Sequence, residues 1–520
     1  MKKKALLGFL SLLILVSLSA RDEDIWDRAI EKSSAILSLI EQNYYRDVEP
    51  DKLVYSSIRG MLETLDPHSY FLDPDNLSRM REEYTGKYYG LGIQIQKHED
   101  SLVVIAPIEG TPASRLGIQP GDIISTIDGE STKPLSSFEA MQKLRGPKGT
   151  KVTITIVRDG LDKPLELTIE REEIPLHSVA YAFMVTDTTG YIFIRNFAET
   201  TTEEFEQKIT QLTAQGMKQL ILDLRRNTGG PFFQSIALSD EFLPKGDVIV
   251  SIKGRNRVYN REFRAQRDGQ LENVPLVILI NRGSASASEI VSGAVMDNDR
   301  GYIVGEDSWG KGLVQTVFPL GENLAVALTT AKYFTPSGRS IQRDYEHIED
   351  YMLYKRAPED QREVRYTAKG RKVLGQGGIA PDYEVTSTLK TFTLELMNRG
   401  AFFGYARKFA GHETALSKDS VFPNDQRSPG ISPEGHDFTV GTPVLEDFKA
   451  YLRASKIAFD EPRFAEAETE IKRELEREIV SSLWGIEEGV RAYRKTDAVV
   501  LKALEIMPEA SKFIADNNSR

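Results

Sequence analysis

The sequence contains no cysteine and only six histidines among its 520 residues. The absence of cysteine excludes disulfide bridges, thiolate zinc sites and a cysteine nucleophile. The few, scattered histidines supply metal chemistry poorly, and we expect neither a metal nor another cofactor. Basic residues are also in deficit, with 66 against 77 acidic residues and a formal net charge of −11. This balance argues against a nucleic-acid-binding protein, which needs basic residues to neutralise phosphates.

Residues 1–19 are predicted to be a secretory signal peptide. Lysines at 2–4 precede the apolar run Ala5 to Val16, and Ser17 and Ser19 give the small-x-small pattern of a cleavage site. The alternative is an uncleaved membrane anchor, although the apolar run is short for a membrane span, and membrane association is expected only in that case. We therefore expect an exported protein of the periplasm or cell envelope.

Residues 20–85 are predicted to form a helical module, because apolar residues recur at helical spacing on both sides of Pro50. From 86 to 172 the apolar period changes to two, with glycines and prolines between the expected strands. The glycine-rich entry at 89–93 and the stretch TPASRLGIQPGDII at 111–124 resemble a PDZ domain. In such domains a glycine-rich loop receives a terminal carboxylate and the adjacent strand edge pairs with the peptide. The resemblance implies that Leu91, Gly92 and Ile93 receive the C-terminus of a substrate.

Residues 173–388 alternate predicted strands with predicted helices, which is typical of an α/β core. A charged segment at about 344–372 interrupts this core and is expected on the surface. Residues 389–520 are predicted to form a helical domain whose role is packing or oligomerisation. The expected elements of the core are strands at 191–195, 219–224 and 275–280 and helices at 202–215, 232–242 and 290–296.

The most informative segment is the turn 281–289 between a buried strand and a helix, which contains Ser284, Ser286 and Ser288. Such a turn exposes a hydroxyl at the carboxyl end of a sheet, with the following N–H groups directed at whatever the hydroxyl attacks. The turn alone favours the plainer interpretation, that the serines cap the helix. The lysine in Gly310-Lys311-Gly312 favours a functional role for this stretch. Glycine weakens a strand without helping solubility, so two glycines around an exposed lysine are unusual, whereas they fit close packing around a functional amine. A lysine made neutral by burial can take the proton of a serine. No histidine lies close in sequence to Ser286, so a Ser-Lys pair is a more economical hypothesis than a serine with a distant histidine as its base.

These segments are similar to the C-terminal processing peptidases, also called tail-specific proteases. In that family the serine and the lysine stand twenty-five residues apart, as Ser286 and Lys311 do, whereas Ser284 and Ser288 fall out of register. The resemblance spans about 25–385 and includes the PDZ-like module. Its other motifs are Leu65 to Ser69, Leu222 to Gly230, Tyr333 to Arg339 and Gly378 to Asp382.

The resemblance implies a role for each matching residue. Ser286 would be the nucleophile, Lys311 the general base and Gln315 the group that orients the lysine. The oxyanion would be held by the N–H of Ala287 and by one N–H of the glycine pair, with Gly229 favoured over Gly230. Glu289 and Asp297 match acidic positions of the family and are expected to be structural supports.

The predicted fold is multidomain α+β, with a ClpP/crotonase-like α/β protease core, an inserted PDZ domain and helical segments at both ends. The predicted function is an exported serine endopeptidase acting on proteins or peptides with apolar C-termini. A binding scaffold on the same fold would have lost the serine or the lysine, and both are present. A hydrolase of small esters would not need a carboxylate-binding module. The sequence leaves open a homo-oligomer, such as a dimer, or an adaptor protein as partner.

Overall fold

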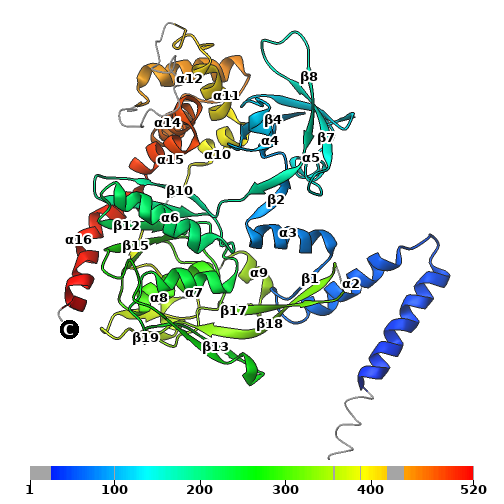
Figure 1. Ribbon diagram of the computed structural model, residues 1–520, viewed down its shortest axis with the longest axis vertical. Coiled ribbons are helices and arrows are strands. Elements are labelled where there is room, and N and C mark those ends of the chain that lie inside the picture. Colours follow the sequence, from blue (N-terminus) through cyan, green and yellow to red (C-terminus); the bar gives the residue numbers. More distant parts are fainter. Residues whose placement is uncertain are drawn as a thin grey trace, which may run out of the picture. The chain divides into compact units, whose positions relative to one another are not determined.

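The computed structural model describes residues 25–98, 100–321, 323–354, 358–386, 388–418 and 438–518. The predicted signal peptide at 1–19 lies outside these ranges. The chain forms two compact units (Figure 1). The first contains the chain up to residue 77 together with 315–329, and the second contains 78–314 and the chain from 330 onward.

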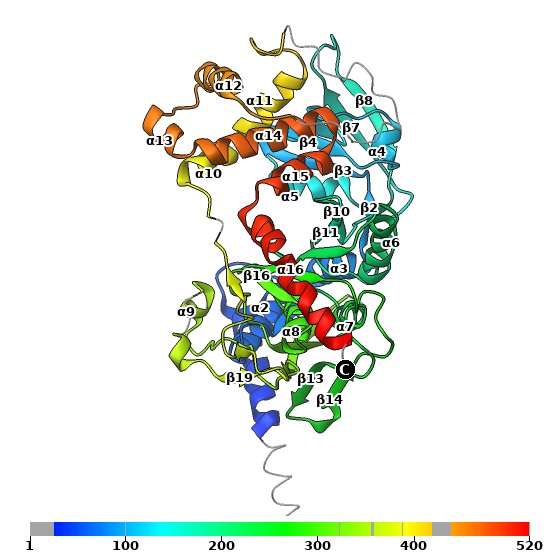
Figure 2. The ribbon, with the colours of Figure 1, turned by 90° about the vertical axis from the view of Figure 1, so that its left-hand side faces the viewer.

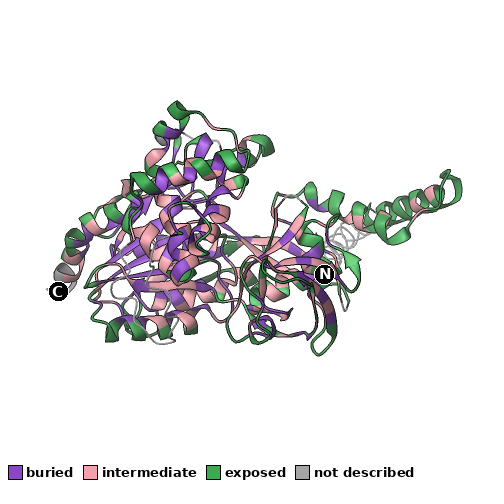
Figure 3. Ribbon diagram, turned by 90° about the horizontal axis from the view of Figure 1, so that it is seen from above, coloured by how far each residue is buried: buried purple, intermediate pink, exposed green. Residues whose placement is uncertain are grey.

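The first unit is helical apart from a small antiparallel sheet. A helix covers 25–43 and is largely exposed, as its green ribbon in Figure 3 shows. α2 spans Pro50–Glu63 and starts at its proline, which has no N–H to leave unsatisfied. β1 (Tyr70–Leu72) pairs with β18 (Ala325–Phe334), which follows β17 (Leu313–Pro319). α3 (Pro74–Thr85) leads on into the second unit.

The second unit begins with a small antiparallel barrel-like module. Its sheet has the order β3-β4-β5-β7-β8, with β6 beside β5, so β3 is an edge strand. Alternate residues of β4 and β7, such as Val104 and Ile154, point into one apolar core. β2 (Lys87–Gly90) and β9 (Glu172–Pro175) pair where the chain enters and leaves. The other elements are β3 (Ile93–His98), β4 (Ser101–Pro107), α4 (Pro112–Arg115), β5 (Ile123–Ile127), β6 (Glu130–Ser131), α5 (Ser137–Leu144), β7 (Lys151–Val157) and β8 (Leu165–Glu170).

The centre of the second unit is a six-stranded sheet in the order β10-β11-β12-β15-β16-β21. Only β10 runs antiparallel to its neighbour. A separate sheet joins β18 to β13 (Val248–Gly254) and β14 (Arg261–Arg264), with the short helix η1 (Arg257–Tyr259) between the last two. The strands of the central sheet are β10 (Val179–Met184), β11 (Thr189–Ile194), β12 (Gln219–Asp223), β15 (Leu276–Ile280), β16 (Tyr302–Gly305) and β21 (Tyr383–Glu384).

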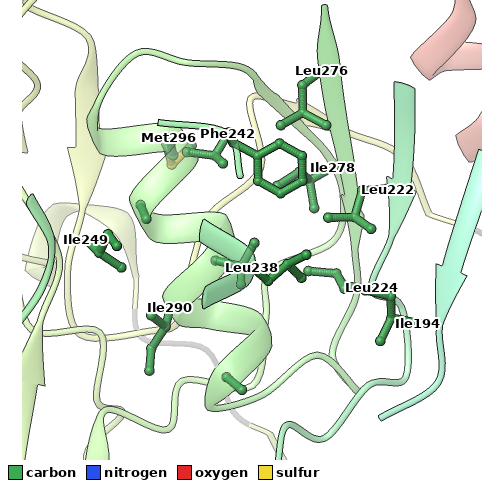
Figure 4. Close-up of a cluster of buried hydrophobic side chains, with 14 of the residues drawn as sticks. Ile194, Leu222, Leu224, Leu238, Phe242, Ile249, Leu276, Ile278, Ile290 and Met296 are labelled. Atoms are coloured by element: carbon green, nitrogen blue, oxygen red, sulfur yellow. The ribbon is translucent and has the colours of Figure 1, made fainter. Parts of the chain in front are cut away.

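Both faces of the central sheet are buried, which explains why its strands are continuously apolar. One face, with Leu222 and Ile278, packs against α6 (Thr201–Ala214), α7 (Phe232–Asp240) and α8 (Ala287–Asp297). Figure 4 shows Leu238 of α7 and Ile290 of α8 in this cluster. The other face is covered by α16 (Ala498–Asn518), which runs along the sheet in Figures 1 and 2. Its contacts join Ile221, Val277 and Leu279 of the sheet to Val500, Ala503, Ile506 and Met507 of the helix.

An ion-pair network fixes the start of α16 to the end of β12. Arg225 binds Asp223 at 2.6 Å and Asp497 at 2.8 Å, and Arg494 binds Asp497 at 2.8 Å. Burial opposes ionisation of Asp497, but Arg225 and Arg494 lower the pKa of this carboxyl to about 2. α16 is therefore part of the α/β core, although it lies within the predicted C-terminal domain.

The helices before α16 have an apolar core of their own, which includes Phe402, Phe448 and Leu475. No helix in the described ranges is both long enough and apolar enough to cross a membrane. The helices that form this separate core are α10 (Thr391–Asn398), α11 (Ala401–Ala410), α12 (Thr442–Ala454), α13 (Glu461–Glu466) and α14 (Glu468–Trp484), and α15 (Ile486–Lys495) follows them.

The charged segment 344–372 contains α9 (Ile348–Met352), η2 (Glu359–Gln361), β19 (Val364–Tyr366) and the first residue of β20 (Lys372–Leu374). We expected this segment on the surface, and for several residues that prediction is wrong. Tyr351, Arg362 and Thr367 are buried, because they bind Trp309, Asp307 and Asp299 of the α/β core.

Candidate active site

Ser286 occupies the last position of the turn between β15 and α8, immediately before the first helical residue Ala287. Its backbone has φ 55° and ψ −110°, a conformation that L-residues rarely adopt. Such strain persists only where the surroundings enforce it, and it is frequent at catalytic nucleophiles on strand-to-helix turns. Ser286 is partly exposed at this turn.

The two neighbouring serines have structural roles. Ser284 is fully buried and its hydroxyl donates to the carbonyl of Leu224 at 2.7 Å. Ser288 is also fully buried and its hydroxyl donates to the carbonyl of Asn227 at 2.9 Å. Both serines therefore tie the turn to the loop after β12, and neither is available as a nucleophile.

The glycine pair lies directly beside this turn. A Cβ on Gly229 would meet the Cβ of Ser286 at 2.9 Å and the nitrogen of Ala287 at 3.0 Å, so only glycine allows this approach. The Gly229 N–H donates to the side chain of Asn227 at 2.9 Å. Within the described residues the N–H groups of Gly230 and Ala287 have no acceptor. The Gly229 N–H is therefore already bonded, and the assignment of Gly229, Gly230 and Ala287 to the oxyanion hole remains a prediction.

Lys311 lies in the loop that connects β16 to β17 and is partly buried. A Cβ on Gly310 would meet the Arg343 side chain at 2.6 Å, and one on Gly312 would meet the nitrogen of Gln342 at 3.0 Å. The glycines on either side of the lysine therefore serve close packing against the segment 342–343.

Glu289 joins the serine turn to the lysine loop. One carboxylate oxygen accepts the N–H of Ser286 at 2.7 Å and the N–H of Lys311 at 3.0 Å. The other accepts the N–H of Gly310 at 2.6 Å and the hydroxyl of Ser308 at 2.5 Å. Burial raises the pKa of Glu289 to about 7, and these four donors work against that increase. The backbone N–H groups of Ser286 and Lys311 thus share one acceptor oxygen, which brings the two backbones close together.

Tyr333 makes a second connection between the same two residues. Its buried hydroxyl lies 2.7 Å from the carbonyl oxygen of Lys311 and 3.3 Å from that of Ser286. Burial raises the pKa of Tyr333 well above its usual value, so this group remains a neutral donor. The sequence analysis assigned no role to Tyr333, and its position in the motif Tyr333 to Arg339 was the only signal.

Asp297 lies at the other end of α8 and binds Arg339 at 2.7 Å, with both side chains fully buried. It also accepts the hydroxyl of Ser337 at 2.6 Å. Its partners belong to the turn 335–339, not to the serine turn or the lysine loop, and this favours the predicted role as a support.

Gln315 belongs to the first unit, where its side-chain amide donates to Thr329 at 3.3 Å. Thr329 in turn donates to Asp66 at 3.0 Å, within the motif Leu65 to Ser69. Orientation of Lys311 by Gln315 remains a prediction.

The three predicted peptide-binding residues stand at the start of edge strand β3. Leu91 is 2% exposed and its side chain lies in the apolar core, so it can offer a peptide only its backbone. Gly92 has φ +77°, and a Cβ there would meet Thr111 at 2.3 Å. Ile93 is half-buried on edge strand β3. α5 lies beside this strand, and the N–H of Lys97 on β3 donates to the hydroxyl of Ser137 on α5 at 3.0 Å.

Models of known protein families match the N-terminal part of the chain, the module that contains β3 and the core that contains Ser286 and Lys311. Peptidase family S41 matches residues 188–350, the PDZ domain matches 90–169 and the activating protease CtpB N-terminal domain matches 16–76. PDZ domains bind peptide C-termini, which supports peptide substrates for this chain.

Two relatives are similar over most of their length. The carboxy-terminal-processing protease of Bartonella bacilliformis is 40% identical over 341 residues, covering 64% of this chain and 78% of that protein. Carboxy-terminal processing protease CtpA of Bacillus subtilis is 34% identical over 318 residues, covering 61% and 67%. Among solved structures, the photosystem II D1 C-terminal processing protease is 28% identical with a TM-score of 0.36, covering 68% of this chain and 87% of that one. The chain therefore belongs to the carboxy-terminal processing proteases, the serine-type peptidases of family S41 that carry a PDZ domain.

Proposed function

We propose that this protein is an exported endopeptidase that captures C-terminal tails on its PDZ domain and hydrolyses peptide bonds with Ser286 and Lys311. Lys311 takes the proton from the Ser286 hydroxyl, the serine attacks the scissile carbonyl, and the lysine returns the proton to the leaving amine. Water then hydrolyses the acyl-enzyme by the same route. Gln315 orients the lysine in this scheme.

The observation that carries the proposal is the shared acceptor on Glu289. Proton transfer requires the two functional groups to be neighbours, and Glu289 accepts the N–H of both Ser286 and Lys311 on one oxygen. The N–H groups of Gly230 and Ala287 supply the oxyanion hole, each contributing about 3 kcal/mol to the transition state.

The free edge of β3 supports the binding step. An extended peptide with an apolar last residue can pair with this edge beside α5, while its carboxylate meets the backbone of Leu91, Gly92 and Ile93. The proposed substrates are therefore proteins or peptides with apolar C-termini.

The first test compares Ser286→Ala and Lys311→Ala with the parent on an unfolded substrate that ends in apolar residues. We expect kcat to fall by at least about 10³-fold in either variant, because the serine and its base act as one unit. Ser288→Ala is the matched control, with the same chemical change on the same turn and most activity retained. Undiminished cleavage by either dyad variant would sink the assignment.

The second test concerns the PDZ domain. Amidating the substrate's C-terminus removes the charge that the glycine-rich loop receives, so KM should rise while kcat changes little. Indifference to the amide would remove the proposed role of this loop.

Export rests on the basic and apolar pattern of residues 1–19. N-terminal sequencing of the protein from a cell-envelope fraction should begin at Ala20, and an intact Met1 in that fraction would instead favour an uncleaved anchor.

A further inference from the structure

The loop that carries Lys311 has little regular structure of its own. It leaves β16 at Gly305 and reaches β17 at Leu313, and glycines stand on both sides of the lysine. Glycine adds backbone freedom and offers no side chain to pack. Contacts from elsewhere in the fold must therefore hold the loop in one conformation.

Arg343 provides the first of these contacts. It is 5% exposed, its backbone N–H donates to the carbonyl of Gly310 at 3.0 Å, and its Nε donates to the carbonyl of Trp309. Its guanidinium carbon lies 4.6 Å from the centre of the Trp309 ring. This arginine thus fixes the two residues that precede Lys311.

Two tyrosines of the segment 344–372 enclose Arg343 from the other sides. The guanidinium carbon lies 4.5 Å from the ring centre of Tyr351, on α9, and 4.3 Å from that of Tyr354. The Nη2 atom of Arg343 is buried and has no hydrogen-bond partner in the described part of the chain. The aromatic faces are therefore important in stabilising this buried cation.

The same segment also binds the loop directly. The Tyr354 hydroxyl donates to the carbonyls of Asp307, at 3.1 Å, and Ser308, and the Tyr351 hydroxyl accepts the indole N–H of Trp309 at 3.0 Å. Arg362 forms a buried ion pair with Asp307 at 3.3 Å. Successive residues from 307 to 310 are thus held by Arg343 and by the segment that follows it.

We propose that residues 344–354 and 358–372 form a strap that positions the Lys311 loop for catalysis, with Tyr351, Tyr354 and Arg362 as its positioning residues. This inference rests on the proposed Ser286–Lys311 dyad. The three residues do not act on the substrate. The strap affects the chemical step by fixing the position of the backbone immediately before Lys311. The aromatic and basic residues of this charged segment are then explained by the loop they hold.

The test compares the parent with Tyr351→Ala/Tyr354→Ala, Tyr351→Phe and Tyr354→Phe. We expect kcat of the double alanine variant to fall by about 100-fold with KM within about twofold, because a displacement of about 1 Å in a catalytic group has this order of effect. The Phe variants keep both rings around Arg343 and lose only a hydroxyl, so they should recover most of the 100-fold loss: kcat should stay near the parental value in Tyr351→Phe and fall by about threefold in Tyr354→Phe. Tyr366→Ala, at a 63% exposed position on β19 of the same segment, is the matched control and should behave as the parent.

A fluorophosphonate that labels the active serine gives a readout independent of the PDZ domain. Its labelling rate should fall in parallel with kcat in the double alanine variant. If Lys311→Ala is inactive while the folded double alanine variant keeps the parental kcat and labelling rate, the strap proposal is overturned and the dyad proposal stands. An active Lys311→Ala variant would instead overturn the dyad. If the double variant does not fold, Tyr354→Phe decides: loss of its donor to two carbonyls must lower kcat by about threefold or more at unchanged KM, and parental kcat overturns the proposal.

Discussion

Two buried acids at opposite ends of α8 stabilise their charge in different ways. Asp297, at the C-terminal end, faces the guanidinium of Arg339 in an ion pair that solvent does not reach. Glu289, in the first turn, has no ion pair among the described residues and accepts only neutral donors, three backbone N–H groups and the hydroxyl of Ser308. The pKa of Glu289 rises to about 7 because burial outweighs these donors.

The difference shows how one helix serves both the fold and the site. An ion pair binds two residues strongly but fixes only the groups that carry the charges. A carboxylate with four short hydrogen bonds fixes the backbone at several points at once, which is what neighbouring catalytic residues require. We therefore expect substitutions of Asp297 to act on stability and those of Glu289 to act on catalysis.

The largest expected effect is on stability. Asp297→Ala leaves Arg339 as an uncompensated buried charge, so the free energy of unfolding should fall by about 3–5 kcal/mol. Urea denaturation checks this value. Asp297→Leu/Arg339→Met removes both charges and should recover part of the loss; equal destabilisation by the single and double variants would contradict a role for the unpaired cation.

Glu289→Gln should act mainly on the chemical step. The amide replaces one of the two accepting oxygens by an NH₂ group, so two of the four donors lose their acceptor and the link between the serine turn and the lysine loop is weakened. We expect kcat to fall by about 100-fold with little change in KM. Steady-state kinetics with Glu306→Gln, at a half-buried position on the lysine loop, provides the control. A parental kcat in Glu289→Gln would show that the shared oxygen has no catalytic consequence.

The pH dependence of stability separates the two acids further. The pKa of Glu289 is raised from 4.5 to about 7 on folding, so the folded state binds more protons than the unfolded state between these values. The resulting stability is fully present below about pH 4.5 and is lost as pH rises through about 7. Unfolding free energies of the parent and Glu289→Gln, measured from pH 5 to 8, should therefore diverge in slope, and parallel curves would argue against the raised pKa.

The smallest expected effects come from removing one donor at each acid. Ser337→Ala deletes the hydroxyl bound to Asp297 and should lower the free energy of unfolding by about 1 kcal/mol without changing kcat. Ser308→Ala deletes the hydroxyl bound to Glu289 and should lower kcat by about threefold at a similar cost in stability. If Ser337→Ala also lowered kcat, or if Ser308→Ala left kcat unchanged, the contrast between the two acids would fail.

The sequence predicted the local features of the site well. The apolar strand before the turn, the small residues within it and the glycines around Lys311 are all local signals, and they lead to the turn and the loop that the structure brings together. The choice of Ser286 among three serines came from the register of the family, and the structure adds that Ser284 and Ser288 are buried and bonded.

The remaining features depend on pairings between distant residues, which no local pattern encodes. Tyr351 and Tyr354 belong to a stretch that appears merely charged until Arg343 is found between their rings. Leu91 belongs to a glycine-rich loop, yet its side chain completes the apolar core of the PDZ domain. The sequence analysis assigned residues 389–520 to packing or oligomerisation, and it did not reveal that α16 packs on one face of the central sheet.

That partnership sets the timing of folding during synthesis. Strands β11, β12 and β15 leave the ribosome some 200 residues or more before α16 does, and until then one apolar face of their sheet has no helix to cover it. One face of the sheet that carries the serine turn therefore stays without its covering helix until the C-terminal residues have been made, and this face is where a growing chain exposes apolar surface.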